Sequence, residues 1–295
     1  MQAEKNVPDD TKRRTATLLM TCKDQKGLVH RISDFIYRHG GNILHADQHI
    51  DFDTGFFLSR VEWDLEGFAL GRMEIPRAFA PLAEPLEMEW RLQFSDEPLR
   101  VALFVSRLGH CLMDLLHRWR IGELRCEIVA IVSNHEIHEP AARAHGIPYH
   151  VFPVTPENKR EQEEKELRLL QDFRVDLLVL ARYMQVLTPE FVARHPNGII
   201  NIHHSFLPAF GGARPYEQAY ARGVKLIGAT GHYVTPIVDD GPIIEQDTVR
   251  VSHRDSLDDF IRKGRDLERM VLARAVRAHL EGRVLPCGNK TVVFD

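Results

Sequence analysis

The chain has 295 residues, of which 44% are hydrophobic and 27% charged, and its formal net charge is −4. At roughly 150 residues per domain this length predicts about two domains, and the apolar fraction excludes wholesale disorder. The weak negative charge argues against a basic surface for nucleic acid, so we expect no nucleic-acid partner. No apolar run approaches the roughly 18 residues of a membrane-spanning helix, so we expect no membrane partner either.

The first 94 residues combine strand and helix patterns that are typical of a small mixed domain. Alternating or β-branched runs indicate strands, and apolar residues at helical spacing indicate helices. They predict strand, helix, strand, strand, helix and strand over residues 15–22, 28–40, 42–51, 56–64, 71–83 and 86–92. This βαββαβ order is the ferredoxin-like unit. We therefore assign residues 1–94 to a first domain.

After a polar linker at 94–98 the pattern changes, and we assign residues 95–295 to a second domain. Short apolar runs now alternate with helical stretches; the runs lie at 99–106, 126–133, 147–153, 175–183 and 197–204. This alternation predicts βαβ units and a Rossmann-like parallel sheet. The strongly charged segment 157–172 predicts a solvated helix with Glu161 and Lys165 as an i,i+4 pair.

The densest polar cluster, residues 201–205, lies at the end of a predicted strand. Asn201 and His203 are two residues apart, so they share one face of an extended strand. Ligands of open α/β sheets bind beyond the carboxyl ends of the strands. An amide and an imidazole side by side can stabilise an oxyanion and move a proton. Local hydrogen bonding without catalysis is the alternative interpretation.

Two adjacent carboxylates, Asp239 and Asp240, lie in a Pro/Gly-containing loop between apolar strands. The pattern alone favours a turn with both side chains in solvent. In the second interpretation the loop brings one carboxylate to a histidine, where it would orient the ring and favour its protonated form.

Metal and nucleotide chemistry are the competing possibilities. The candidate metal ligands are His195, His203, His204, His232 and Asp239. Their spacing matches no compact zinc signature, so we expect no metal. The turn at 106–111 contains neither GxGxxG nor GxxxxGK[ST], which argues against a nucleotide cofactor. The four scattered cysteines form no CxxC pair and the N-terminus has no secretory apolar segment, so we expect a cytoplasmic protein.

Several long segments together resemble a known family. NIHHSFLPAFGGARPYEQAYARGVKLIGATGHYV at 201–234, followed by DDGPIIEQDTV at 239–249, resembles the folate-dependent formyltransferase fold. LARYMQVLTPEF at 180–191 and NKTVVF at 289–294 also match. The most similar members are the formyltetrahydrofolate deformylases, hydrolases that release formate from 10-formyltetrahydrofolate. Residues 22–51 are similar to the ACT regulatory module of those enzymes.

The resemblance implies roles for individual residues. The family's catalytic Asn, His and Asp fall on Asn201, His203 and Asp239. The family's folate-binding loops, which hold the pterin through backbone groups and apolar walls, fall on Met184, Gln185, Val186, Leu187, Thr235, Ile237 and Val238. Core packing is the alternative for any single apolar member. Folate is the substrate in this family, so no separate cofactor is expected.

Two positions depart from the family pattern. From that pattern we expect His where this chain has Glu217, and Ala where it has Gly231. Glu217 would place a carboxylate near the site, and Gly231 would loosen the backbone beside His232. Relatives that formylate glycinamide ribonucleotide hold its phosphate with a Gly/Asn-rich first turn. Here that turn offers one glycine at 106–111, which favours water as the acceptor. A formyltransferase with another acceptor and a catalytically silent amino-acid sensor are the alternatives.

The ACT-like segment implies regulation and assembly. Such modules bind amino acids at a dimer interface near the loop after their first strand. In this chain the loop comprises Asp24, Gln25, Lys26, Gly27, Leu28 and Val29. We expect glycine or methionine as the effector and a homo-oligomer, a dimer or a tetramer, formed through this domain. A purely structural dimerisation module is the alternative.

Overall fold

The computed structural model describes residues 13–209 and 214–295. The chain divides into two compact units: the first ends at Pro98 and includes Phe294–Asp295, and the second spans Leu99–Val293. The linker predicted at 94–98 runs from the last strand of the first unit to the first strand of the second. In the ranges described, each helix is either too short or too polar to cross a membrane.

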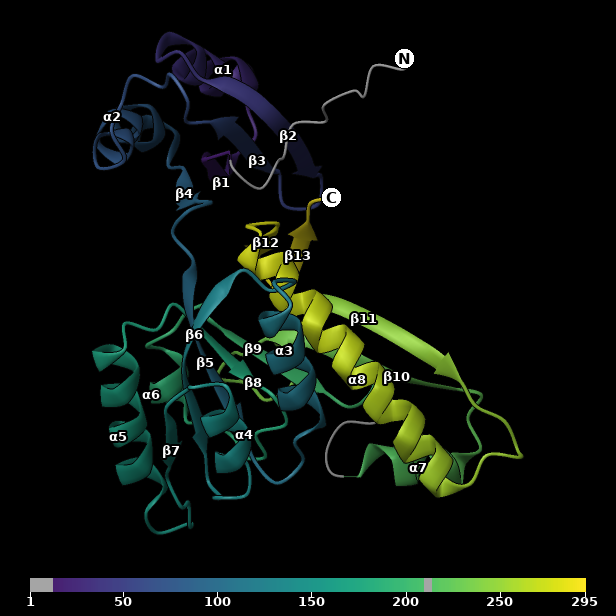
Figure 1. Ribbon diagram of the computed structural model, residues 1–295. Helices are drawn as coiled ribbons and strands as arrows, with labels where there is room; N and C mark the ends of the chain where they lie inside the picture. The colour runs from purple at the N-terminus through teal and green to yellow at the C-terminus, as the bar shows by residue number, and fades with distance from the viewer. Residues whose placement is uncertain (1–12, 210–213) are drawn as a thin grey trace, which may run out of the picture. The chain divides into compact units, whose positions relative to one another are not determined.

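The first unit has the predicted ferredoxin-like order of elements. Its strands are β1 (Thr15–Lys23), β2 (Asn42–Asp51), β3 (Phe56–Asp64) and β4 (Glu89–Phe94), and its helices are α1 (Leu28–Arg38), α2 (Glu74–Ala83) and the 3-10 helix η2 (Glu84–Leu86). The strands pair antiparallel in the order β2-β3-β1-β4 (Figure 1). Leu86 lies in η2 and not in the last strand, because Pro85 offers no N–H to a strand ladder and Glu87 turns the chain at φ 47°.

The second unit is built on a mixed sheet of order β11-β10-β9-β8-β5-β6-β7 (Figure 1). The strands are β5 (Leu99–Val105), β6 (Cys126–Ser133), β7 (Tyr149–Val151), β8 (Leu177–Leu180), β9 (Ile199–His203), β10 (Leu226–Tyr233) and β11 (Ile243–Arg250). The pairings from β7 across to β9 are parallel, as predicted. Both pairings of β10 are antiparallel, so the predicted Rossmann-like parallel sheet ends in an antiparallel edge. The link from β10 to β11 is too short for the helical crossover that a parallel pair needs.

Helices cover both faces of this sheet. One core lies against α3 (His110–Arg120), α4 (Glu139–Ala144) and α8 (Leu257–Leu280), and the other against α5 (Lys159–Asp172) and α6 (Pro189–Val192). The remaining helix, α7 (Pro215–Arg222), packs on α8, and β12 (Val284–Cys287) pairs with β13 (Lys290–Val293). In β5, Leu103 faces the first core and Phe104 the second. Burial on both faces explains why β5 is a continuous apolar run.

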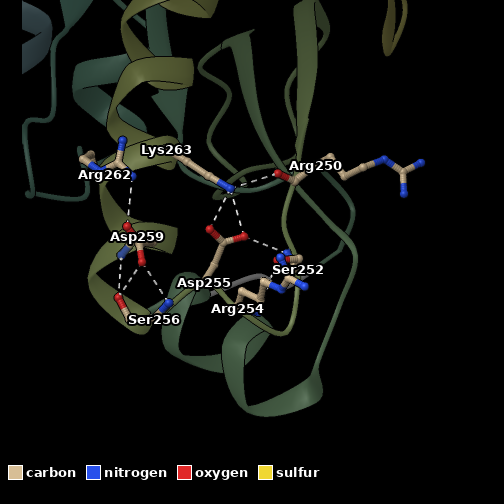
Figure 2. Close-up of polar contacts among 8 residues, drawn as sticks. All are labelled: Arg250, Ser252, Arg254, Asp255, Ser256, Asp259, Arg262 and Lys263. Atoms are coloured by element: carbon tan, nitrogen blue, oxygen red, sulfur yellow. Dashed lines mark hydrogen bonds and ion pairs between the residues drawn. The ribbon is translucent and has the colours of Figure 1, made fainter.

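The start of α8 is fixed by a group of polar contacts (Figure 2). Ser256 and Asp259 form a reciprocal capping box, in which each side chain accepts a hydrogen bond from the other's backbone N–H. Lys263 donates from Nζ to both carboxylate oxygens of Asp255 at 2.9 Å, and Asp255 also accepts from the backbone N–H of Ser252. These contacts set where α8 begins, and α8 supplies a buried carboxylate to the site described below.

The charged helix α5 departs from its prediction on one face. The expected pair of Glu161 and Lys165 is present, with Nζ and Oε1 2.6 Å apart. However, Glu163 and Glu166 are buried, with only 6% and 1% of their surface exposed. The prediction of a fully solvated helix is therefore wrong for this face of α5.

Candidate active site

A cavity of about 640 Å³ opens at the carboxyl ends of β5, β8 and β9. It lies beside the point where the strand order reverses, between β5 and β8, which is where open α/β sheets bind ligands. The volume suits a small organic ligand. Its walls come from residues within the segments 108–110, 180–187, 201–204, 214–217, 232–239 and 261–268.

The structure brings Asn201, His203 and Asp239 together on this cavity. β9 presents Asn201 and His203, and the loop after β10 presents Asp239 with its Oδ1 3.1 Å from His203 Nδ1. That hydrogen bond holds the pKa of Asp239 below its usual value, so its carboxylate is ionised at neutral pH. The opposite ring nitrogen, His203 Nε2, is buried and has no hydrogen-bond partner in the described part of the chain. His203 is thus oriented by a carboxylate and keeps one nitrogen for a ligand.

His232 orients Asn201, a role that the sequence did not predict. Its Nδ1 lies 2.9 Å from the carbonyl oxygen of Tyr233, which can only accept, so Nδ1 carries the proton. Burial lowers the pKa of His232, which favours the neutral ring. Nε2 then accepts from Asn201 Nδ2 at 3.2 Å. One N–H of the amide is thereby fixed and the second remains to donate to a ligand.

A second polar cluster, centred on Glu268 of α8, lines the same cavity. Glu268 is 1% exposed, and its Oε1 accepts a hydrogen bond from Tyr216 Oη at 2.5 Å. Its Oε2 lies 2.7 Å from His110 Nε2 and 3.4 Å from Arg182 Nε. Burial would raise the pKa of Glu268, but the His110 hydrogen bond and the Arg182 charge outweigh it and lower the pKa. Burial and the Arg182 charge lower the pKa of His204 to about 4, so this ring is neutral at pH 7.

The predicted folate loops form an apolar wall of the cavity. Six of their members line it: Met184, Gln185, Val186, Leu187, Thr235 and Val238. Met184, Val186 and Val238 are more than half exposed, so nothing in the described chain covers them. Leu187 is buried and also belongs to the core under α5, as the packing alternative anticipated. Ile237 does not line the cavity and is 66% exposed, so its predicted contact with folate stays a prediction.

The two departures from the family pattern have different settings. Glu217 lines the cavity, where its Oε2 lies 3.6 Å from Arg214 Nε. Gly231 is buried in β10, and a Cβ there would lie 2.8 Å from Cβ of Ala275 on α8. The missing side chain lets α8 pack closely on β10, and the register between β10 and β11 shifts between Gly231 and His232.

The candidate metal ligands are only partly gathered. His203, His204, His232 and Asp239 line the cavity, whereas His195 lies apart from it, after α6. In the described ranges, a group of three side chains with ligand atoms within 4.8 Å of one another is formed by His110, Cys111 and Glu268. Glu268 is already engaged there by His110, Arg182 and Tyr216. Occupied carboxylate oxygens beside a guanidinium disfavour a cation.

The predicted effector loop joins β1 to α1 in the first unit. Asp24, Gln25, Lys26 and Gly27 are exposed, and Val29 is half exposed. Leu28 is only 3% exposed and belongs to the core of this unit, so its side chain is not available to an effector. The loop could therefore contact a ligand through its polar turn and its backbone, but not through Leu28.

Comparisons with known proteins agree with this architecture. The sequence model described as formyl transferase matches residues 99–276, and the model described as ACT domain matches residues 16–69. A protein named formyltetrahydrofolate deformylase from Synechocystis is 60% identical over 280 residues, covering 95% of this chain and 98% of that protein. The protein of the same name from Bacillus subtilis is 50% identical over 279 residues, covering 94% and 93%.

Solved structures give the same result. The crystal structure of a formyltetrahydrofolate deformylase from Pseudomonas syringae superimposes with a TM-score of 0.94 at 49% identity, covering 96% of this chain and 95% of that one. A glycinamide ribonucleotide transformylase from Symbiobacterium toebii has a TM-score of 0.64 at 31% identity and covers 70% of this chain and 98% of its own. The resemblance to the deformylases thus extends over both units.

Proposed function

The chain belongs to the formyltetrahydrofolate deformylase family, and we propose that the cavity of its second unit is where it hydrolyses 10-formyltetrahydrofolate to formate and tetrahydrofolate. The observation that carries this assignment is the grouping of Asn201, His203 and Asp239 beside an open apolar wall. The wall suits a flat pterin, and the polar group suits a formyl carbonyl. Folate acts here as the substrate, and the proposed chemistry needs no further cofactor.

The proposed mechanism uses these three side chains. Water attacks the formyl carbon, and Asp239 accepts the proton that water loses. The tetrahedral oxyanion is stabilised by the free N–H of Asn201 and by protonated His203, which Asp239 holds in place at 3.1 Å. The C–N bond then breaks as the folate nitrogen takes the proton back from Asp239. The second proton of the attacking water passes to solvent, and the product leaves as formate. Losing one such oxyanion donor typically costs about 10²–10³ in rate.

Water is the acceptor that the geometry favours. A ribonucleotide acceptor would need open backbone amides for its phosphate at the turn after β5. The glycine in that turn, Gly109, has the ring of His138 on one side, since a Cβ at Gly109 would lie 2.4 Å from His138 Cε1. Gly109 is thus only partly exposed, and the His138 ring narrows the approach of a phosphate to this turn.

Incubation of the protein with 10-formyltetrahydrofolate alone tests this function. We expect formate and tetrahydrofolate to appear in equal amounts without any added acceptor, measured by a formate assay and by the absorbance of the folate. Formate production only in the presence of an added amine would indicate a transferase. No turnover under any of these conditions would leave the catalytically silent amino-acid sensor as the better description.

We also propose that the first unit, which matches the ACT domain, binds glycine or methionine and joins copies of the chain into a dimer or tetramer. The exposed turn at 24–27 supports this, because the side chains of Asp24, Gln25 and Lys26 are exposed and can contact an amino acid. Calorimetry with each amino acid is expected to show saturable heat. No heat with either would favour a purely structural dimerisation module. We place the enzyme in the cytoplasm, where its formate would supply one-carbon metabolism and purine biosynthesis.

A further inference from the structure

Helix α5 contacts the folate wall along one face. Lys159, Glu163 and Glu166 are spaced i, i+4 and i+7, so they lie on one side of the helix. All three side chains bond to the segment 183–188, which contains the four wall residues 184–187. The remaining acidic residues in the middle of α5, Glu161 and Glu164, are exposed.

Each end of the wall segment is held by one buried carboxylate. At the start, Tyr183 donates its hydroxyl to Glu166 Oε1 at 3.0 Å. At the end, Thr188 donates its backbone N–H to Glu163 Oε1 at 3.0 Å and its hydroxyl to Glu163 Oε2. Between them, Lys159 Nζ donates to the carbonyl oxygen of Val186. The segment is thus attached to α5 at its start, middle and end.

Apart from its bonds to α5, the wall segment is held by the buried side chain of Leu187 and by one further hydrogen bond. Residues 184–187 belong to no helix or strand, and Met184 and Val186 are more than half exposed. One further bond, from the Met184 backbone N–H to Ser106 Oγ at 2.9 Å, ties the segment to the end of β5. An irregular loop with exposed apolar side chains has little packing of its own, so its conformation depends on such bonds.

Burying two carboxylates is costly, and this cost argues that they have a role. Glu163 and Glu166 are 6% and 1% exposed. Burial raises the pKa of Glu166 to about 7, against the hydrogen bond from Tyr183, which lowers it. An apolar side chain would stabilise the fold as well or better at such a position. Groups kept in so unfavourable a setting are often found at functional sites.

We propose that Glu163 and Glu166 are positioning residues for substrate binding, which hold Thr188 and Tyr183 and so preform the wall on which the folate lies. Neither carboxylate contacts the reacting atoms. This inference rests on the proposed function, because it takes the wall at 184–187 as the place where folate binds. A preformed wall binds its ligand more tightly, because none of the binding free energy is used to order the loop.

The test measures KM, kcat and the Kd for tetrahydrofolate in Glu163→Gln and Glu166→Gln. In Glu163→Gln we expect KM and Kd to rise roughly tenfold, the size that loss of a charged hydrogen bond typically produces. In Glu166→Gln the rise is expected to be smaller, because a pKa of about 7 leaves that carboxyl partly protonated. In both variants kcat should stay nearly unchanged. Glu164→Gln is the matched control, since Glu164 is a neighbour on the same helix with a side chain that is 69% exposed. It is expected to behave as the unsubstituted protein.

A second pair of variants tests the hydroxyl of Thr188, which donates to Glu163 and also caps the start of α6 by accepting from the Phe191 backbone N–H. Thr188→Ser keeps the hydroxyl that bonds to Glu163 and should retain KM, whereas Thr188→Val removes it and should raise KM. Unchanged KM and Kd in both glutamine variants, or equal KM in the two Thr188 variants, would overturn the proposal. The Kd for tetrahydrofolate can be measured without turnover, so the role of the wall is tested even if no hydrolysis is observed. Absence of hydrolysis would count against the proposed function and not against the positioning role.

Discussion

Asp239→Asn is expected to lower kcat by about 10²–10⁴-fold, the range seen when a charged partner or an oxyanion donor is removed from such a site. The asparagine oxygen can still accept the bond that His203 Nδ1 now makes to Asp239 at 3.1 Å. The negative charge that balances protonated His203 is lost, however, and so is the acceptor for the proton of water. Tetrahydrofolate binding should persist, because the apolar wall is untouched. Steady-state hydrolysis and calorimetric Kd values measure the two effects separately.

The pKa of Asp239 fixes the pH range in which this comparison is valid. The hydrogen bond from His203 lowers that pKa in the folded protein. A depressed folded value means that the interaction contributes fully above the unfolded pKa of about 3.9 and is lost only as the pH falls through the folded value. Across pH 6–8 the wild-type carboxylate is therefore charged, and the comparison with asparagine measures the loss of that charge.

Asp240→Asn is the control for this experiment. Asp240 is the adjacent residue, is exposed, and forms no ion pair in the described part of the chain. Its substitution should leave kcat within about twofold, as for most exposed positions away from special contacts. Near-normal turnover of Asp239→Asn together with a loss in Asp240→Asn would transfer the role to Asp240. Normal turnover of both variants would remove this loop from the mechanism.

The parts of the fold that local patterns encode could be predicted from the sequence. The continuous apolar run of β5 follows from its burial on both faces, and the parallel part of the second unit's sheet was anticipated from such runs. The shared face of Asn201 and His203 follows likewise from the two-residue period of a strand. The reversal of β10 relative to β9 could not be foreseen, because the chain between them is long enough for either direction and strand direction then depends on pairing across the sheet.

Side-chain networks formed between distant segments could not be predicted. Glu268 bonds to Tyr216, 52 residues away, and to His110, 158 residues away, and no local pattern on α8 distinguishes it from an exposed glutamate. The pairing of His232 with Asn201 likewise requires the register between β9 and β10. Composition alone suggested that all of α5 is exposed to solvent. It could not show the buried face, because buried and exposed glutamates are neighbours in the same helix.

Gly241→Ala is expected to lower kcat at least about 10²-fold, because a misplacement of about 1 Å at a catalytic group can have that effect. A Cβ at Gly241 would lie 1.7 Å from the carbonyl oxygen of Tyr233 and 2.8 Å from its carbonyl carbon. Both atoms are backbone, so no side-chain rotation relieves the clash, and the loop that carries Asp239 must shift. The hydrogen bond from Tyr233 N–H to the carbonyl oxygen of Pro242, now 2.9 Å, would be strained as well.

Gly198→Ala provides the matched control for Gly241→Ala. Gly198 immediately precedes β9, but a Cβ there would lie 3.5 Å from its nearest atoms, which is ordinary van der Waals contact. The kcat and melting temperature of the Gly198→Ala variant should therefore stay close to those of the unsubstituted protein. Equal activity of the two alanine variants would show that the loop can move without displacing Asp239 from His203. A loss confined to Gly241→Ala would instead mean that the glycine of the Asp-Asp-Gly sequence is required for close backbone approach, and that this approach sets the position of the catalytic carboxylate.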